Sequence, residues 1–204
     1  MFFKKNRIYQ FISIMIISLS TMSCVTESVE TSPGMKFSEA AVISVQDPGV
    51  SIAAGSTFSW LPDAVHFYED DRLKDAPIKS LIEAEIIKNL KAKEMVFVDS
   101  VNGAKYAIAY TAALESSLDD NAIIRHFGLL PGNSQVPQGD ANVEKGTVII
   151  YVFNTRTDEV TWRSAAQVGV QFDTPDEERK ARVEKVIAEM FKTFPDEHKA
   201  GANK

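Results

Sequence analysis

Apolar residues follow two different periods along this chain. Alternating or continuous apolar runs, rich in β-branched and aromatic residues, predict strands at 41–45, 56–60, 95–98, 106–114, 146–153 and 160–172. Leu61 and Pro62 are expected to end the second of these strands. Apolar residues at three- and four-residue spacing predict two helices, one from Pro77 to Leu90 and one after the capping box at 174–177 that runs to Phe194.

The order of these elements indicates the fold class. Two strands, a helix, two strands, a long loop, two strands and a helix follow one another, and the hairpin joining 146–153 to 160–172 through 154–159 has the strongest signal. This order places both helices on the same side of the strands. We therefore predict an α+β fold with two layers, a mostly antiparallel sheet with two helices packed on one face.

The long loop, residues 116–145, is rich in Asp, Asn, Pro and Gly and shows neither period. Because it is far longer than an ordinary connection, we expect it to be either functional or mobile.

The N-terminus has the pattern of a bacterial export signal. Lys4, Lys5 and Arg7 precede an apolar run, which is followed by small residues and then by Cys24, the only cysteine. The run is too short and too polar for a membrane-spanning helix. We predict a lipoprotein signal peptide at 1–23 and an acylated Cys24. The alternative is an ordinary secretory signal that leaves a free thiol, because Thr21 stands where an aliphatic residue is usual.

The rest of the chain divides into three parts. A tether rich in Ser, Thr, Glu and Pro is expected at 24–40, a single periplasmic α+β domain at 41–196, and a disordered tail at 197–204. No Asp follows Cys24, which favours the outer membrane over retention in the inner membrane. The expected location is therefore the outer membrane, with a lipid anchor and the domain facing the periplasm.

Charge excludes one class of partner. Removing residues 1–23 leaves 19 basic and 28 acidic groups of the original 22 and 28, so the net charge changes from −6 to −9. Nucleic acid and anionic membrane surfaces both require clustered Lys and Arg, so nucleic-acid binding is not expected.

Catalytic and metal-binding motifs are missing from the sequence. His66, His126 and His198 lack the paired spacing of zinc sites, and the chain contains no nucleophile elbow, phosphate-binding loop or dinucleotide fingerprint. We therefore expect no cofactor, no metal and no enzymatic activity.

A candidate binding surface rests on a few aromatic and polar residues. Trp60, Tyr68 and His126 would line a groove closed by the 116–145 loop, and Arg163 would face solvent on the sheet. The competing interpretation places Trp60 and Trp162 in the core, where large rings in strands usually pack.

Several stretches resemble the domain of unknown function 4136, a family of outer-membrane lipoproteins of Gram-negative bacteria. The similarity covers about 55–195 and includes Thr57–Pro62, Asp71–Leu73, Gly146–Ile150 and Val160–Arg163. Glu94 stands where that family usually has Gly, and Asn154 where Asp is common. The resemblance implies a lipid-anchored periplasmic domain and carries over no activity.

Two functions remain open. The first is a non-enzymatic outer-membrane lipoprotein whose periplasmic domain binds or scaffolds other envelope components, protein partners among them. The second is a small-ligand-binding or hydrolytic envelope protein that uses 116–145 as a lid.

Overall fold

A computed structural model describes residues 39–74 and 76–194. The predicted signal peptide, Cys24, most of the tether and the tail lie outside these residues. The elements, in chain order, are β1 (Ala41–Gln46), β2 (Thr57–Phe67), η1 (Asp71–Leu73), α2 (Ile78–Ala92), β3 (Val96–Phe97), η2 (Val101–Gly103), β4 (Tyr106–Leu114), α3 (Asp120–Phe127), β5 (Val143–Asn154), β6 (Val160–Gln171) and α4 (Asp176–Phe191).

The strands form one mixed sheet in the order β1-β6-β5-β4-β2-β3. The pairs β1–β6, β5–β6 and β4–β5 are antiparallel, whereas β2 is parallel to both β3 and β4. Parallel neighbours need a crossover, and α2 lies in the connection from β2 to β4. The predicted α+β class with a mostly antiparallel sheet is confirmed, and the parallel pairs are an addition to it.

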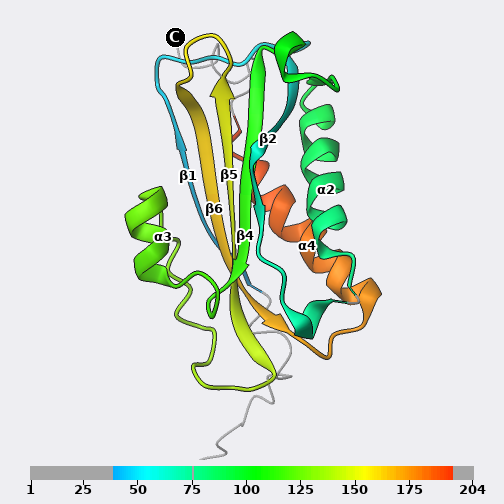
Figure 1. Cartoon of the computed structure of the whole chain (residues 1–204), viewed down its shortest axis with the longest axis vertical. Coiled ribbons are helices and arrows are strands. Elements are labelled where there is room, and N and C mark those ends of the chain that lie inside the picture. Colours follow the sequence, from blue (N-terminus) through cyan, green and yellow to red (C-terminus); the bar gives the residue numbers. More distant parts are fainter. Residues whose placement is uncertain (1–38, 75, 195–204) are drawn as a thin grey trace, which may run out of the picture. The chain divides into compact units, whose positions relative to one another are not determined.

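Helices α2 and α4 cover one face of the sheet, as predicted (Figure 1). Their apolar stripes contact the even-numbered residues of the central strands. Among these, Trp162 is fully buried, and its ring centre lies 5.2 Å from that of Phe191 and 5.1 Å from that of Phe194. Burial of large apolar side chains such as these contributes to the hydrophobic driving force of the fold. Core packing is therefore the correct interpretation of Trp162.

A third helix, α3, lies on the opposite face of the sheet (Figure 1). Ile123 of α3 is fully buried and clusters with Ala113, Ile149 and Ala165, which point away from α2 and α4. The Asp119 side chain accepts a hydrogen bond from the Ala122 backbone at 2.7 Å, which caps the helix. The prediction of one irregular loop over 116–145 is wrong at this point, because a short helix interrupts the loop.

Strand β2 also differs from the prediction that Leu61 and Pro62 end it. It continues to Phe67, and its register with β4 shifts between Trp60 and Val65. Because the residues in that interval are not paired in the ladder, Pro62 breaks no hydrogen bond there and the strand resumes beyond it.

No helix in the described ranges has the length and apolar character needed to cross a membrane.

Candidate functional site

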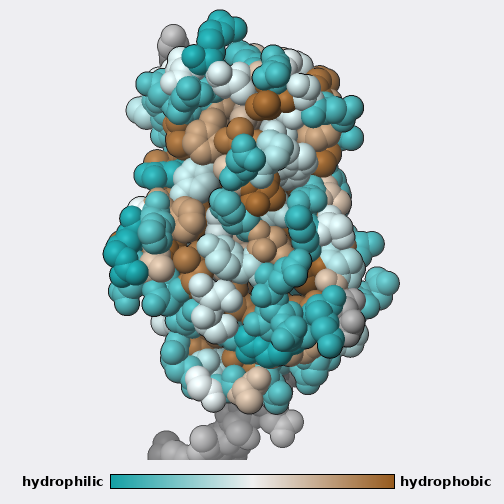
Figure 2. Space-filling view, viewed as in Figure 1, coloured by the Kyte–Doolittle hydropathy of each residue, from teal (hydrophilic) through white to brown (hydrophobic). Residues whose placement is uncertain are grey.

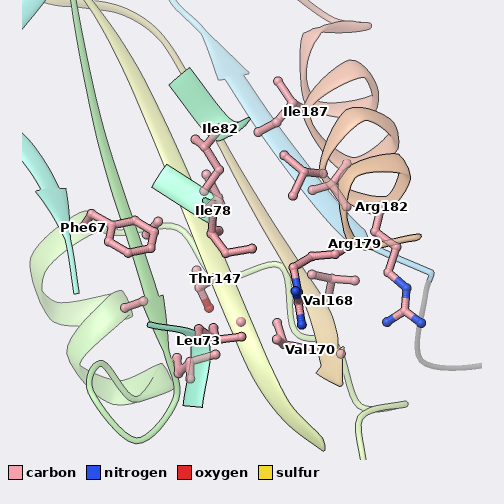
Figure 3. A pocket seen from close by; sticks show the side chains of 18 of the residues that line it. Phe67, Leu73, Ile78, Ile82, Thr147, Val168, Val170, Arg179, Arg182 and Ile187 are labelled. Atoms are coloured by element: carbon pink, nitrogen blue, oxygen red, sulfur yellow. The ribbon is translucent and has the colours of Figure 1, made fainter. Parts of the chain in front are cut away.

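An apolar cavity of about 120 Å³ lies between the sheet and its two covering helices. It sits where β4 and β6 end and β5 begins, and Figure 3 shows side chains from both layers converging on it. The sheet contributes Ala112, Leu114, Gly146, Val148, Val168 and Val170. The helices contribute Ile78, Ile82, Val183, Val186 and Ile187.

The cavity exists because the helices cover this end of the sheet incompletely. Ile150 and Val152 on β5 are 0% and 2% exposed, whereas Val148 on the same face of that strand is only half-buried. On β6 the same change occurs between the buried Ala166 and the half-buried Val168. The side chains of this end therefore contact open space in place of helix side chains.

Gly146 shapes the floor of the cavity. A Cβ atom at this position would lie 2.6 Å from Cγ2 of Val170, which is too close for any ordinary contact. The missing side chain therefore lets Val170 lie across β5. A glycine at the start of an apolar strand is the sequence signal for such a close approach.

The lining determines what the cavity accepts. An apolar cavity of about 150 Å³ stays dry and binds benzene. The cavity here is similar in size and its lining is almost wholly apolar, although one side is open to solvent, so it favours a small apolar group over the water that can enter it.

One side of the cavity is closed by the segment that follows β2, residues 68–74, which we call the strap. Leu73 of the strap lines the cavity. Arg72 holds the strap through Nη2, which lies 2.7 Å from Oδ2 of Asp70 and 2.7 Å from Oε2 of Glu144, and its guanidinium lies 4.2 Å from the ring centre of Phe172. These contacts connect the strap to β5 and to the end of β6.

The contacts of the strap lower the pKa values of two carboxyl groups, those of Asp70 and Glu144. Hydrogen bonds from Arg72 lower the pKa of Asp70 to about 2. Burial alone would raise the pKa of Glu144, but hydrogen bonds from Ser116 and Arg72 lower it below its usual value. Both carboxylates are therefore charged at neutral pH and hold the strap in place.

Two arginines of α4 line the cavity near its mouth. Arg179 donates from Nη1 to Oδ1 of Asp176 at 2.6 Å and from Nη2 to the Phe172 carbonyl at 3.3 Å. Its Nε is buried and has no hydrogen-bond partner among the described residues. Arg182 donates from Nη2 to Glu178 and Gln171 at 2.6 and 2.8 Å. In Figure 3 the Arg179 side chain lies beside Val168, whereas Arg182 points away from the cavity.

The structure does not bring the predicted binding residues together. Trp60 is half-buried on the helix side, 5.8 Å from the Tyr110 ring, and Tyr68 is 45% exposed and lines the cavity. His126 is exposed on α3 at the opposite face, where Arg163 donates to the Phe127 carbonyl at 3.3 Å. A groove formed by Trp60, Tyr68 and His126 is therefore absent from the described structure.

The 116–145 segment is not a lid over this cavity. None of its described residues lines the cavity, because α3 and the residues after it pack on the other face of the sheet. The expectation of a lid is wrong for this reason.

A buried polar network fixes that segment. Gln167 is fully buried, and its Oε1 accepts hydrogen bonds from the backbone of Gly132 and Asn133 at 3.0 and 3.1 Å. Its Nε2 donates to Asp120 at 2.8 Å, and Asp120 also accepts from Lys145 at 2.7 Å. Burial alone would lower the pKa of Lys145, but its carboxylate partners raise it. The sequence gives no periodic signal for this network, so sequence reasoning missed it.

Other surfaces are less suited to an apolar ligand. Figure 2 shows hydrophobic side chains in small groups separated by hydrophilic ones. A wider hollow of about 750 Å³ outside the strap has charged residues in its lining, among them Asp71, Lys74 and Lys79, beside apolar ones such as Leu73 and Pro77. Within the described ranges, no cluster of three or more His, Cys, Asp or Glu side chains is placed to hold a metal ion.

A family profile described as "Domain of unknown function (DUF4136)" matches residues 42–196. This span agrees with the one that the sequence motifs indicate. No curated protein matches the chain.

Three solved structures resemble the chain at low identity. The PelC dodecamer from Paraburkholderia phytofirmans has a TM-score of 0.47 and 11% identity, covering 78% of this chain and 99% of that one. A DUF4136 family protein from Bacteroides thetaiotaomicron has a TM-score of 0.43 and 15% identity, covering 74% and 94%. A PDZ domain protein from Parabacteroides distasonis has a TM-score of 0.43 and 10% identity, covering 78% and 37%. We infer neither ligand nor function from them.

Proposed function

We propose that this chain, which belongs to the DUF4136 family, is a lipid-anchored outer-membrane protein. Its domain binds an apolar ligand and does not catalyse a reaction. The observation that carries the binding function is the cavity of about 120 Å³ between sheet and helices. A concave, mostly apolar pocket with a few polar groups is the usual form of a small-ligand site.

The lining residues support binding over catalysis. Among the described residues that line the cavity, none is a histidine, cysteine, serine, lysine or carboxylate. The Thr147 hydroxyl accepts a hydrogen bond from Gln167, on the other face of the sheet. General acid–base and nucleophilic catalysis both need a titratable or activated group at the substrate. Among the described lining residues the phenol of Tyr68 is the one such candidate, and it is 45% exposed, so the apolar lining has the chemistry of a binding site.

The anchor is supported by the N-terminal sequence. Lys4, Lys5 and Arg7, an apolar run and small residues precede Cys24, in the order that export of a lipoprotein requires. Acyl chains contribute about 0.8 kcal/mol per buried methylene, so two or three chains hold a protein at a membrane stably. No Asp follows Cys24, which favours the outer membrane.

Fractionation of cells that express the full chain tests the anchor. We expect the wild-type protein in the outer-membrane fraction, and we expect Cys24→Ala to be either released from it or left as an uncut precursor. A Cys24→Ala protein that is processed and fractionates with the outer membrane like wild type would contradict the anchor.

Binding is tested with benzene as a probe of the complete mature chain, residues 24–204, carrying Cys24→Ser so that no acyl group is attached. We expect benzene to raise the thermal unfolding temperature, because a ligand of the folded state stabilises it by mass action. The matched control is Ala112→Leu, which fills the cavity floor and should abolish the shift. An unchanged unfolding temperature in saturating benzene would refute the binding function.

A further inference from the structure

We infer that the cavity binds the hydrocarbon end of a single-chain amphiphile whose carboxylate is held by Arg179. This inference rests on the proposed binding function and adds the chemical class of the ligand. It is carried by two independent observations, the size of the apolar cavity and the unpartnered Nε of Arg179.

The volume of the cavity limits the size of the apolar part of the ligand. A volume of about 120 Å³ is close to that of a cavity that holds one benzene ring, so it encloses about six carbon atoms at the methyl end of a chain, and the carbons nearer the headgroup lie at the open side. Two acyl chains side by side exceed this space, which excludes a diacyl phospholipid as the occupant. The methyl groups of Val148, Val168 and Val183 line the cavity and would contact a single chain.

Arg179 supplies the polar end of the site. Its Nη1 and Nη2 already donate to Asp176 and to the Phe172 carbonyl, but Nε has no acceptor among the described residues. A buried N–H without an acceptor costs free energy, and turning the guanidinium toward the cavity would let Nε donate to a ligand oxygen and remove that cost. Figure 3 shows this side chain lying on the cavity side, next to Val168.

The local charges favour an anion at this position. The side chains of Arg179 and Arg182 are 14% and 15% exposed, whereas their partners Asp176 and Glu178 are 76% and 56% exposed. Of the two guanidinium groups, that of Arg179 lies on the cavity side, whereas the carboxylates of Asp176 and Glu178 are exposed to solvent. A hydrogen bond from a guanidinium to a carboxylate is stronger than one to a neutral oxygen, so an acid should bind better than an alcohol.

The test is isothermal titration calorimetry of the complete mature chain carrying Cys24→Ser, with three probes below their micelle concentrations: decanoate, decanol and decyltrimethylammonium. We expect decanoate to bind at least tenfold more tightly than decanol, and the cationic probe to bind most weakly. Equal affinity for decanoate and decanol would overturn the assignment of the headgroup to Arg179 but leave the proposed apolar binding intact. No binding by any probe would overturn both.

Two variants locate the headgroup. We expect Arg179→Met to lower decanoate affinity about tenfold and leave decanol affinity unchanged. Lys180→Met removes the same charge from the neighbouring exposed position of α4, and we expect it to change neither affinity. Because decanol binding requires a folded cavity, it also shows that Arg179→Met has folded. Loss of affinity for both probes in Arg179→Met, or an equal effect of Lys180→Met on decanoate, would refute the proposed contact.

Discussion

At the scale of single residues, Glu94 occupies a backbone conformation that its side chain disfavours. Its φ is +61°, immediately after the C-cap of α2, and its carbonyl accepts a hydrogen bond from Gly55 at 2.9 Å. Glycine adopts this left-handed region without a steric cost, and it is the usual residue at this helix position. The motif comparison, in which Gly is usual here, agrees with the observed geometry.

We therefore expect Glu94→Gly to raise the free energy of unfolding by about 0.5–1 kcal/mol, because the relief of left-handed strain exceeds the added entropy of the unfolded chain. Urea denaturation of wild type and the variant measures the change in the free energy of unfolding. Glu94→Ala keeps the Cβ atom and should bring no gain. Equal stabilisation by both substitutions would show that loss of the carboxylate, not backbone strain, is responsible.

The strap depends on the charge of Asp70. The pKa of Asp70 is about 2 in the folded protein, below the value of about 3.9 expected in an unfolded chain. A carboxyl group with a lowered pKa stabilises the fold fully above the unfolded value, and this contribution is lost as pH falls toward the folded value.

We expect wild type to be more stable than Asp70→Asn at pH 7, because the ion pair with Arg72 is lost in the variant. The difference should be only about 1 kcal/mol, because Arg72 is 39% exposed and solvent screens the pair. The difference should persist to about pH 4 and disappear as pH falls toward 2. Urea denaturation across this range checks it, with Asp71→Asn as the control of equal charge change. A difference that does not depend on pH would contradict an ionic role for Asp70.

At the scale of elements, hydrophobic periodicity correctly predicted the helices and strands whose apolar face packs in the main core. The helix expected from Pro77 agrees with α2, and the strand expected at 106–114 agrees with β4. Helix α3 was missed because it is short and lies within a polar segment, although Asp119 and Gly128 are its cap signals. The strand containing Pro62 was predicted too short because a register shift cannot be read from local sequence.

Strand β5 offers a matched test of the cavity. Val148 and Val152 lie on the same face of this strand, but Val148 borders the cavity and Val152 is 2% exposed in packed core. We expect Val148→Ile to raise the free energy of unfolding by about 0.8 kcal/mol, the value of one buried methylene. Val152→Ile should lower it by about 1–3 kcal/mol through overpacking.

Thermal or urea unfolding of the two variants measures these opposite signs. Destabilisation of similar size in both would mean that no free space exists beside Val148.

At the scale of the whole molecule, the sequence predicted the fold class and one helical face, but not the arrangement that creates the site. The parallel pairing of β2 with β4 and the second helical face depend on contacts between distant segments. The cavity likewise needs the strap, two helices and three strand ends together. Of the predicted binding residues, only Tyr68 lines it, because Trp60 joins the core while His126 and Arg163 lie on the α3 side.

The central claim is that an apolar chain enters between the sheet and α2 and α4. The most direct measurement is an isotope-filtered NOE spectrum of the complete mature chain, carrying Cys24→Ser, with decanoate. The account predicts cross-peaks from the terminal methyl group of decanoate to the methyl groups of Val148, Val168 and Val183. Cross-peaks to the exposed Ile43 and Val45 of β1 in place of these, or none at all, would contradict it.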